Sequence, residues 1–198
     1  MRRENIKSNW KKKRPSVQTE TYAKLLHEKL TSEMCRKPAL WSVDELNTKD
    51  LADFKGFAIF IVETLAGGRA TSATDWFLEW LEDVAADARK KKKTNFDKLK
   101  FAILGVGSMD DGEQGFNKTS RILLKRLKIL GSKQIMDVEI LNNNDEKNED
   151  ENTGRFVMFC EELMEAMDRN LPGAEPSDDD CSIDGDSELS EEEDKKNL

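Results

Sequence analysis

Two short apolar runs set the architecture: Phe57-Ala58-Ile59-Phe60-Ile61-Val62 and Lys100-Phe101-Ala102-Ile103-Leu104. Continuous apolar runs of this length, followed by turn residues, are typical of strands that are buried on both faces of a sheet. The first run leads into Leu65-Ala66-Gly67-Gly68, and the second leads into Gly105-Val106-Gly107-Ser108. We therefore expect two buried strands, each ending in a loop that contains glycine.

Two weaker segments also have strand character. Residues Gln134–Ile140 alternate apolar and polar side chains, as the edge strand of a sheet does, and Ala39–Val43 alternate in part. Between the strands, apolar residues recur at helical spacing in four segments: Tyr22–Leu30, Trp76–Val84, Ile122–Leu130 and Phe156–Met167.

Residues that end helices support this pattern. Ser72 or Thr74 is available to cap the N-terminus of the helix expected over Trp76–Val84. Gly131 stands at the C-cap position of the helix expected over Ile122–Leu130. Strands that alternate with helices predict an α/β fold with a parallel sheet and helices on both faces. In such sheets ligands bind beyond the carboxyl ends of the strands, so loops 63–71 and 105–116 are the expected functional segments.

Charge is distributed very unevenly along the 198 residues, of which 37% are hydrophobic and 36% charged, with a formal net charge of −8. The first fourteen residues contain seven Lys or Arg and one acid, whereas residues 171–198 carry a net charge of −9. We expect three parts: a basic arm (1–15), a folded domain (16–170) and an acidic disordered tail (171–198). The polar loop Asn142–Asn152 is expected to be mobile.

Several classes of protein are excluded by the sequence. No apolar run approaches the roughly 20 residues of a membrane span, and no apolar segment follows the basic N-terminus as in a secretory signal. Three widely spaced cysteines (Cys35, Cys160 and Cys181) are incompatible with a disulfide framework or an iron–sulfur cluster triplet and favour a reducing, cytoplasmic location. The lone His27 is expected to be a solvated helix residue, and no metal site is expected.

A resemblance to a known family rests on five segments: Trp76–Asp83, Asp87-Ala88-Arg89, Leu99–Gly107, Phe116-Asn117-Lys118 and Leu127–Gly131. Together they resemble the N-terminal flavodoxin-like domain of the tRNA wybutosine-synthesis enzymes, the radical-SAM tRNA 4-demethylwybutosine synthases. The resemblance covers roughly residues 17–168. It implies a flavodoxin-like three-layer sandwich with a parallel sheet.

The resemblance also implies a function. In that family the domain binds FMN and passes single electrons to a radical-SAM domain that modifies tRNA, so this chain would be the electron-supplying half at most. No side chain would act as a catalytic acid, base or nucleophile. The family's three FMN loops fall on Gln18, Thr19 and Thr21 for the phosphate, Thr64, Leu65, Ala66, Gly67 and Gly68 for the ring, and Gly105, Val106, Gly107 and Ser108 for the far edge of the ring.

This sequence departs from the family pattern at several positions. Glu20 replaces a glycine beside the expected phosphate, so its carboxylate must turn into solvent if phosphate is to bind. Leu65 replaces a ring-stacking aromatic residue, and Ser108 replaces an asparagine. Residues Asn9–Pro15 cannot form the apolar first strand of the sheet. We therefore expect the central first strand to be missing or degenerate, in a diverged and N-terminally truncated chain.

Two alternatives remain open. The chain could be a decayed, non-catalytic flavodoxin-like scaffold that binds partners, with its glycines serving only as turn residues. The basic arm could instead contact tRNA through Arg2, Arg3 and Lys11–Arg14, with Trp10 stacking on a base.

Overall fold

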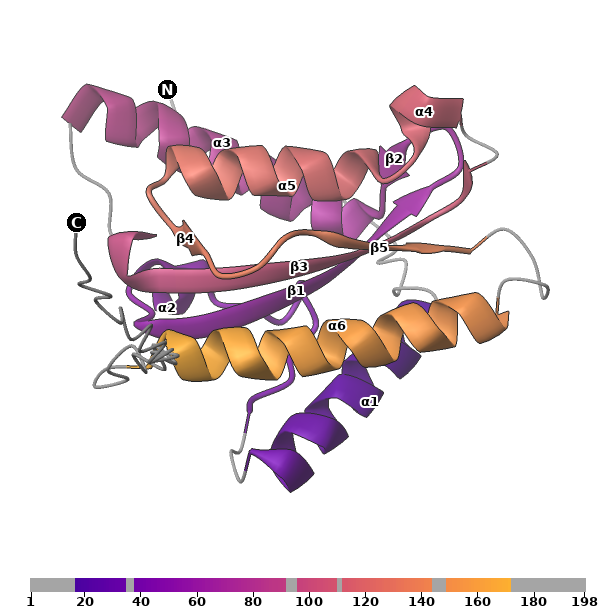
Figure 1. Cartoon of the computed structure of the whole chain (residues 1–198). Coiled ribbons are helices and arrows are strands. Elements are labelled where there is room, and N and C mark those ends of the chain that lie inside the picture. The colour runs from indigo at the N-terminus through magenta and orange to yellow at the C-terminus, as the bar shows by residue number, and fades with distance from the viewer. Residues whose placement is uncertain (1–16, 35–37, 92–95, 110–111, 144–148, 172–198) are drawn as a thin grey trace, which may run out of the picture.

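The computed structural model describes residues 17–34, 38–91, 96–109, 112–143 and 149–171. Within these ranges the chain forms one mostly parallel sheet with helices on both faces (Figure 1). The strands are β1 (Gly56–Leu65), β2 (Arg69–Ala70), β3 (Leu99–Gly107), β4 (Lys133–Gln134) and β5 (Glu139–Asn142). The helices are α1 (Val17–Glu33), α2 (Thr48–Ala52), α3 (Ser72–Lys91), the 3-10 helix η1 (Phe96–Lys98), α4 (Gly112–Gly115), α5 (Lys118–Ile129) and α6 (Glu149–Arg169).

Strands β1 and β3 form the centre of the sheet. They run parallel in continuous register, from Gly56 opposite Leu99 to Glu63 opposite Val106. β4 and β5 pair in parallel with the other edge of β3, and the short β2 turns back antiparallel on the end of β1. The two strands expected from the sequence are confirmed, β3 as a buried strand and β1 as a partly buried one, and their carboxyl ends lie side by side.

Alternate side chains of β3 enter two apolar clusters, because successive residues of a strand point to opposite faces. On one face Phe101 and Ile103 pack in a cluster with side chains of α3 and α5. On the other face Leu104 and Val106 pack in a cluster with side chains of α1 and α6. The three-layer α/β sandwich is therefore confirmed.

The ends of α3 and α5 follow from local side chains. The oxygen Oγ1 of Thr71 accepts a hydrogen bond from the backbone N–H of Thr74 at 3.2 Å, so Thr71 caps α3. The expected caps Ser72 and Thr74 are wrong, because the helix already begins at Ser72. Gly131 follows the C-cap of α5 with a φ of 87°, a left-handed conformation that glycine adopts without a Cβ penalty.

The two weaker strand predictions need correction. Ala39–Val43 form no strand, and Trp41 there is 59% exposed, because no described strand lies beside the segment to pair with it. Gln134–Ile140 are interrupted between β4 and β5. The pairing advances from Phe101 to Leu104 on β3 but from Gln134 to Glu139 on its partner, and the two extra residues break the ladder as a bulge does.

Several expectations fall on residues outside the described ranges. These are the basic arm 1–15 and the acidic tail from residue 172 onward. In the described part of the chain, none of the helices combines the length and the apolar character that crossing a membrane requires.

Candidate functional site

Two loops start at the carboxyl end of the sheet, and one helix N-terminus lies toward that end. The hairpin loop after β1 and the long loop after β3 start next to each other, because Glu63 and Val106 are partners in the parallel register. The N-terminal end of α1, with residues 17–21, lies toward the same end (Figure 1). The segments that the sequence analysis selected are thus on one side of the molecule, where ligands of parallel α/β sheets bind.

The first turn of α1 presents polar side chains at a helix N-terminus. Gln18 and Thr21 are exposed, whereas Thr19 is only 6% exposed. Glu20 reaches back along the helix, and its Oε1 lies 2.7 Å from Nζ of Lys24, with both side chains at least half exposed. The carboxylate therefore points along the solvent side of α1 and is paired with a cation.

The loop after β1 is a tight hairpin. Gly67 and Gly68 have φ values of 76° and 71°, and the N–H of Gly68 donates to the carbonyl of Leu65 at 3.0 Å. A Cβ on Gly68 would lie 3.1 Å from Cα of Gly115, so this glycine allows the two loops to touch. A Cβ on Gly67 would meet nothing within 4 Å. Exposed Ala66 and Gly67 therefore form the open surface of the hairpin.

Thr64 links this hairpin to α5. Its side chain is buried, and its Oγ1 accepts a hydrogen bond from the N–H of Thr119 at 3.2 Å. Because Thr119 belongs to the first turn of α5, the bond satisfies one of the helix's free N–H groups. Thr64 therefore holds two loops together and does not lie on the open surface.

The glycines at the carboxyl end of β3 make room for Asn117. A Cβ on Gly105 would lie 2.4 Å from Oγ of Ser120 and 2.6 Å from Oδ1 of Asn117, and one on Gly107 would lie 3.3 Å from the same Oδ1. Asn117 is 1% exposed with a φ of 49°, and its amide has no hydrogen-bond partner among the described residues. Gly105, Val106 and Gly107 are thus buried, and Ser108 is the member of this group that reaches the surface.

Asn142 at the end of β5 and Asn152 on α6 position the loop that follows β3. Oδ1 of Asn142 accepts a hydrogen bond from the N–H of Met109 at 3.2 Å. Asn152 of α6 holds the backbone of Asn142 on both sides: its Oδ1 accepts from Asn142 N at 3.0 Å, and its Nδ2 donates to Asn142 O at 2.6 Å. The expected mobile loop Asn142–Asn152 therefore begins and ends in ordered structure, while residues 144–148 lie outside the described ranges.

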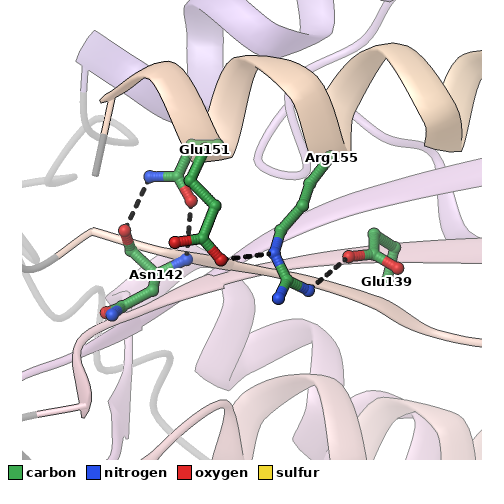
Figure 2. Close-up of polar contacts among 5 residues, drawn as sticks. Glu139, Asn142, Glu151 and Arg155 are labelled. Atoms are coloured by element: carbon green, nitrogen blue, oxygen red, sulfur yellow. Dashed lines mark hydrogen bonds and ion pairs between the residues drawn. The ribbon is translucent and has the colours of Figure 1, made fainter.

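An ion-pair group continues this contact along α6 (Figure 2). Arg155 lies between two carboxylates, donating from Nε to Glu151 at 3.1 Å and from Nη1 to Glu139 at 3.3 Å. Its hydrogen bonds to Glu151 and then to Glu139 raise the pKa of Arg155 above the ordinary arginine value. A surface pocket beside it is lined in part by Glu139, Arg155 and Met158, and none of the site residues expected from the sequence lines it.

Asn117, Asn142 and Asn152 were not among the site residues expected from the sequence. One signal was available for the first, since the glycines at 105 and 107 need a large partner across the loop and Phe116-Asn117 follows closely. The pair Asn142 and Asn152 had no such signal, because the eleven polar residues from Asn142 to Asn152 resemble an unstructured loop.

Comparisons with known proteins agree with this geometry. The sequence profile of the family described as flavodoxin matches residues 16–154. Over 82 residues the chain is 33% identical to the S-adenosyl-L-methionine-dependent tRNA 4-demethylwyosine synthase of Pongo abelii and 34% identical to that of Mus musculus. Each match covers 41% of this chain and 11% of the relative, so the chain spans a small part of these relatives.

Solved structures show the same fold. The flavodoxin of Streptococcus pneumonia TIGR4 matches with a TM-score of 0.58 and 17% identity, over 76% of this chain and 92% of that chain. The Fusobacterium nucleatum flavodoxin bound to flavin mononucleotide matches with a TM-score of 0.53 and 16% identity, over 76% and 90%.

Proposed function

Because this chain belongs to the flavodoxin family, we propose that it binds FMN at the carboxyl end of its sheet and acts as a one-electron carrier. The observation that supports this most is that the hairpin after β1 and the loop after β3 start side by side, with the N-terminal end of α1 toward the same end of the sheet. Bound FMN supplies the electron chemistry, and the residues of the chain bind it, orient it and exclude water.

The phosphate would bind at the N-terminus of α1. Gln18, Thr19 and Thr21 supply hydroxyl and amide groups there, and the positive end of the helix dipole favours an anion. The ion pair of Glu20 with Lys24 keeps the carboxylate directed along the helix. The charge that opposes phosphate binding is thereby partly neutralised.

The flavin ring would lie over the two glycine loops. Leu65, Ala66 and Gly67 would give it an apolar surface, buried Gly68 would let the hairpin approach Gly115, and Ser108 would supply a polar group at its far edge. Gly105, Val106 and Gly107 would support the ring indirectly, because they are buried. The glycines leave space that the Asn117 side chain fills beneath the loop. Asn142 orients the backbone at Met109 from the other side.

The electron acceptor would be a radical-SAM domain that modifies tRNA in the cytoplasm. The similarity to the tRNA 4-demethylwyosine synthases over 82 residues supports this partner. We propose further that the basic arm contacts the tRNA through Arg2, Arg3 and Lys11–Arg14, with Trp10 stacking on a base. Binding of tRNA that weakens with added salt and is lost on deleting residues 1–15 is the expected result; unchanged binding would reject the arm's role.

A non-catalytic interaction protein on the same scaffold is the second candidate. It is favoured by Leu65 in the place of a stacking aromatic residue, whose loss removes about 0.5–1.5 kcal/mol of ring stacking. It predicts a folded chain that takes up no flavin.

A titration separates the two candidates. The full chain, shown to be folded by circular dichroism, is titrated with FMN and, as a matched ligand, with riboflavin, which lacks the phosphate. The flavodoxin proposal predicts saturable binding that is tighter for FMN than for riboflavin. Equal binding would reject the phosphate site at α1, and no binding would favour the interaction protein.

A further inference from the structure

The outward side of α5 is strongly basic. Four exposed cations share this side of the helix, because they follow one another at intervals of three and four residues: Lys118, Arg121, Lys125 and Lys128. We call them the basic face of α5. From residue 116 to residue 136 the sequence contains six Lys or Arg and no acid, although the whole chain has a net charge of −8. The basic face is therefore a local reversal of the charge of the protein.

Three of these cations have no carboxylate partner among the described residues: Lys118, Lys125 and Lys128. The cation of α5 that lies toward α3 differs, because Arg126 pairs there with Glu82. The described domain thus neutralises the side of α5 next to α3 and leaves the three lysines of the basic face unpaired.

The helix dipole accounts for only part of the basic face. A cation in the last turn, such as Lys128, is favourable beside the negative end of a helix. Lys118 and Arg121 lie in the first turn of α5, which contains no acid, and there a positive charge is unfavourable. Their position needs another explanation, and an anionic partner along the face supplies one.

One segment of this chain carries the complementary charge. Residues 172–198 contain eleven acids and two lysines, a net charge of −9; we call them the acidic segment. It follows Asn170, whose carbonyl accepts a hydrogen bond from Nζ of Lys100. Lys100 is the register partner of Lys133 on β4, which follows the end of α5 closely. Figure 1 shows the C-terminal end of α6 and strand β4 at the same end of the sheet.

The acidic segment is also long enough to reach the whole face. An extended chain advances about 3.3 Å per residue, so Asp180 can lie up to about 33 Å from Asn170. The twelve residues of α5 span only about 18 Å. Because the segment is joined to the domain, its acids are present at a high effective concentration beside α5.

We propose that the acidic segment lies along the basic face of α5, with Asp178–Asp180 at Lys125 and Lys128 and the later acids toward Lys118. The contact is electrostatic and exposed, so it weakens as salt is added. A single exposed ion pair contributes little, but several charges that act together form a network. An external polyanion, a tRNA included, has to displace the segment before it binds this face.

The natural cysteines provide the test. In the full chain with Cys35→Ser, Cys181 of the acidic segment carries a nitroxide spin label, whereas Cys160 is buried. At low salt the backbone-amide resonances from Lys118 to Lys128 are expected to lose most of their intensity relative to the reduced label. They are expected to recover it at about 1 M salt, where the Debye length is about 3 Å. The experiment uses no flavin, so its result is independent of the proposed FMN site.

Charge reversal identifies the two partners. Lys125→Glu combined with Lys128→Glu is expected to abolish the loss of intensity. Adding Asp178→Lys, Asp179→Lys and Asp180→Lys to the same chain is expected to restore it, because the charges are then exchanged between the two sides. Circular dichroism establishes that each variant is folded, and the restoration by charge exchange separates a lost contact from a lost fold.

The matched control is Lys49→Glu combined with Lys55→Glu, at exposed lysines outside α5. It makes the same change in net charge and is expected to leave the intensities on α5 as in wild type. Amides of α5 that keep their full intensity in the wild-type segment would overturn the proposal, as would a control pair that acts like the pair on α5. A loss of intensity confined to residues 1–15 would also overturn it and would assign the acidic segment to the basic arm.

Discussion

Asn152 at the start of α6 holds both backbone polar groups of Asn142 at the end of β5. Its amide accepts from Asn142 N at 3.0 Å and donates to Asn142 O at 2.6 Å. Asn142 in turn accepts from the N–H of Met109, and Asn143 donates to the carbonyl of Gly107 at 2.8 Å. A buried side chain on a helix therefore fixes the loop at which we place the edge of the flavin.

Replacing Asn152 tests this chain of contacts. Asn152→Ala leaves two backbone groups without partners, so we expect a loss of about 1–3 kcal/mol in the free energy of unfolding, measured by urea denaturation. Binding of FMN should weaken as well, because the loop at Met109 loses its support. Thr153→Ala, at the exposed neighbouring residue, is the control and should leave FMN affinity unchanged. Equal effects of the two variants would contradict the role of Asn152.

The ion pair on α1 gives a prediction for the phosphate. Lys24→Ala removes the cation that pairs with Glu20, so the dissociation constant of FMN should rise about two- to tenfold. Glu20→Gln should lower it by a similar factor, since a helix N-terminus favours an anion once the competing charge is gone. Lys29→Ala, which breaks the pair with Glu33 at the other end of α1, should change little. If Lys24→Ala and Lys29→Ala act alike, the phosphate does not bind near Glu20.

A substitution at Gly105 tests how closely Asn117 and Ser120 pack against the end of β3. A methyl group there would overlap Ser120 and Asn117, which are both almost fully buried. We expect Gly105→Ala to lower the free energy of unfolding by about 1–3 kcal/mol. Gly154→Ala on α6 is the matched control, because a Cβ there meets nothing within 4 Å and should stabilise the helix by about 0.5–1 kcal/mol. If Gly105→Ala and Gly154→Ala shift the denaturation midpoint in the same direction, the space next to Gly105 is not filled.

Burial of Cys160 predicts a pH dependence. Desolvation raises the pKa of the Cys160 thiol from 9.0 to about 11. The folded chain then binds its proton more tightly than the unfolded chain, so stability is retained below pH 9 and falls as the pH rises toward 11. Burial, together with Glu149, also raises the pKa of Tyr22, which acts in the same direction.

The contribution of Cys160 is obtained by difference. Cys160→Ala should show a smaller loss of stability between pH 9 and 11 than wild type, and wild-type Cys160 should resist alkylation at pH 8 until the chain unfolds. Rapid alkylation of the folded chain at Cys160, located by mass spectrometry of its peptide, would contradict the burial.

The sequence was sufficient to predict those elements whose own side-chain pattern determines their conformation. The runs Phe57–Val62 and Lys100–Leu104 became the two long strands because apolar side chains on both faces favour a strand between two helical layers. Gly131 ended α5 because no other residue adopts its conformation as readily. Ala39–Val43 failed because a strand also needs a neighbour, and the pattern of one segment does not reveal its neighbour.

The site was predictable to a lesser extent. The loops were selected correctly as a group, since parallel strands must end together. Which residues reach the surface was not visible in the sequence, because the burial of Gly105 depends on Asn117, and the order at Asn142 depends on Asn152. Both are contacts between elements, set by the packing of α5 and α6. The assignment of individual residues to FMN stays a prediction.

One measurement tests the central claim most directly: a nuclear magnetic resonance titration of the full, isotope-labelled chain with FMN, followed through its backbone amides. The account predicts saturable shifts confined to residues 17–21, 65–68 and 108–109, with Gly131 and the middle of α6 unchanged. A folded chain whose amides do not respond to FMN, or respond only elsewhere, would contradict it.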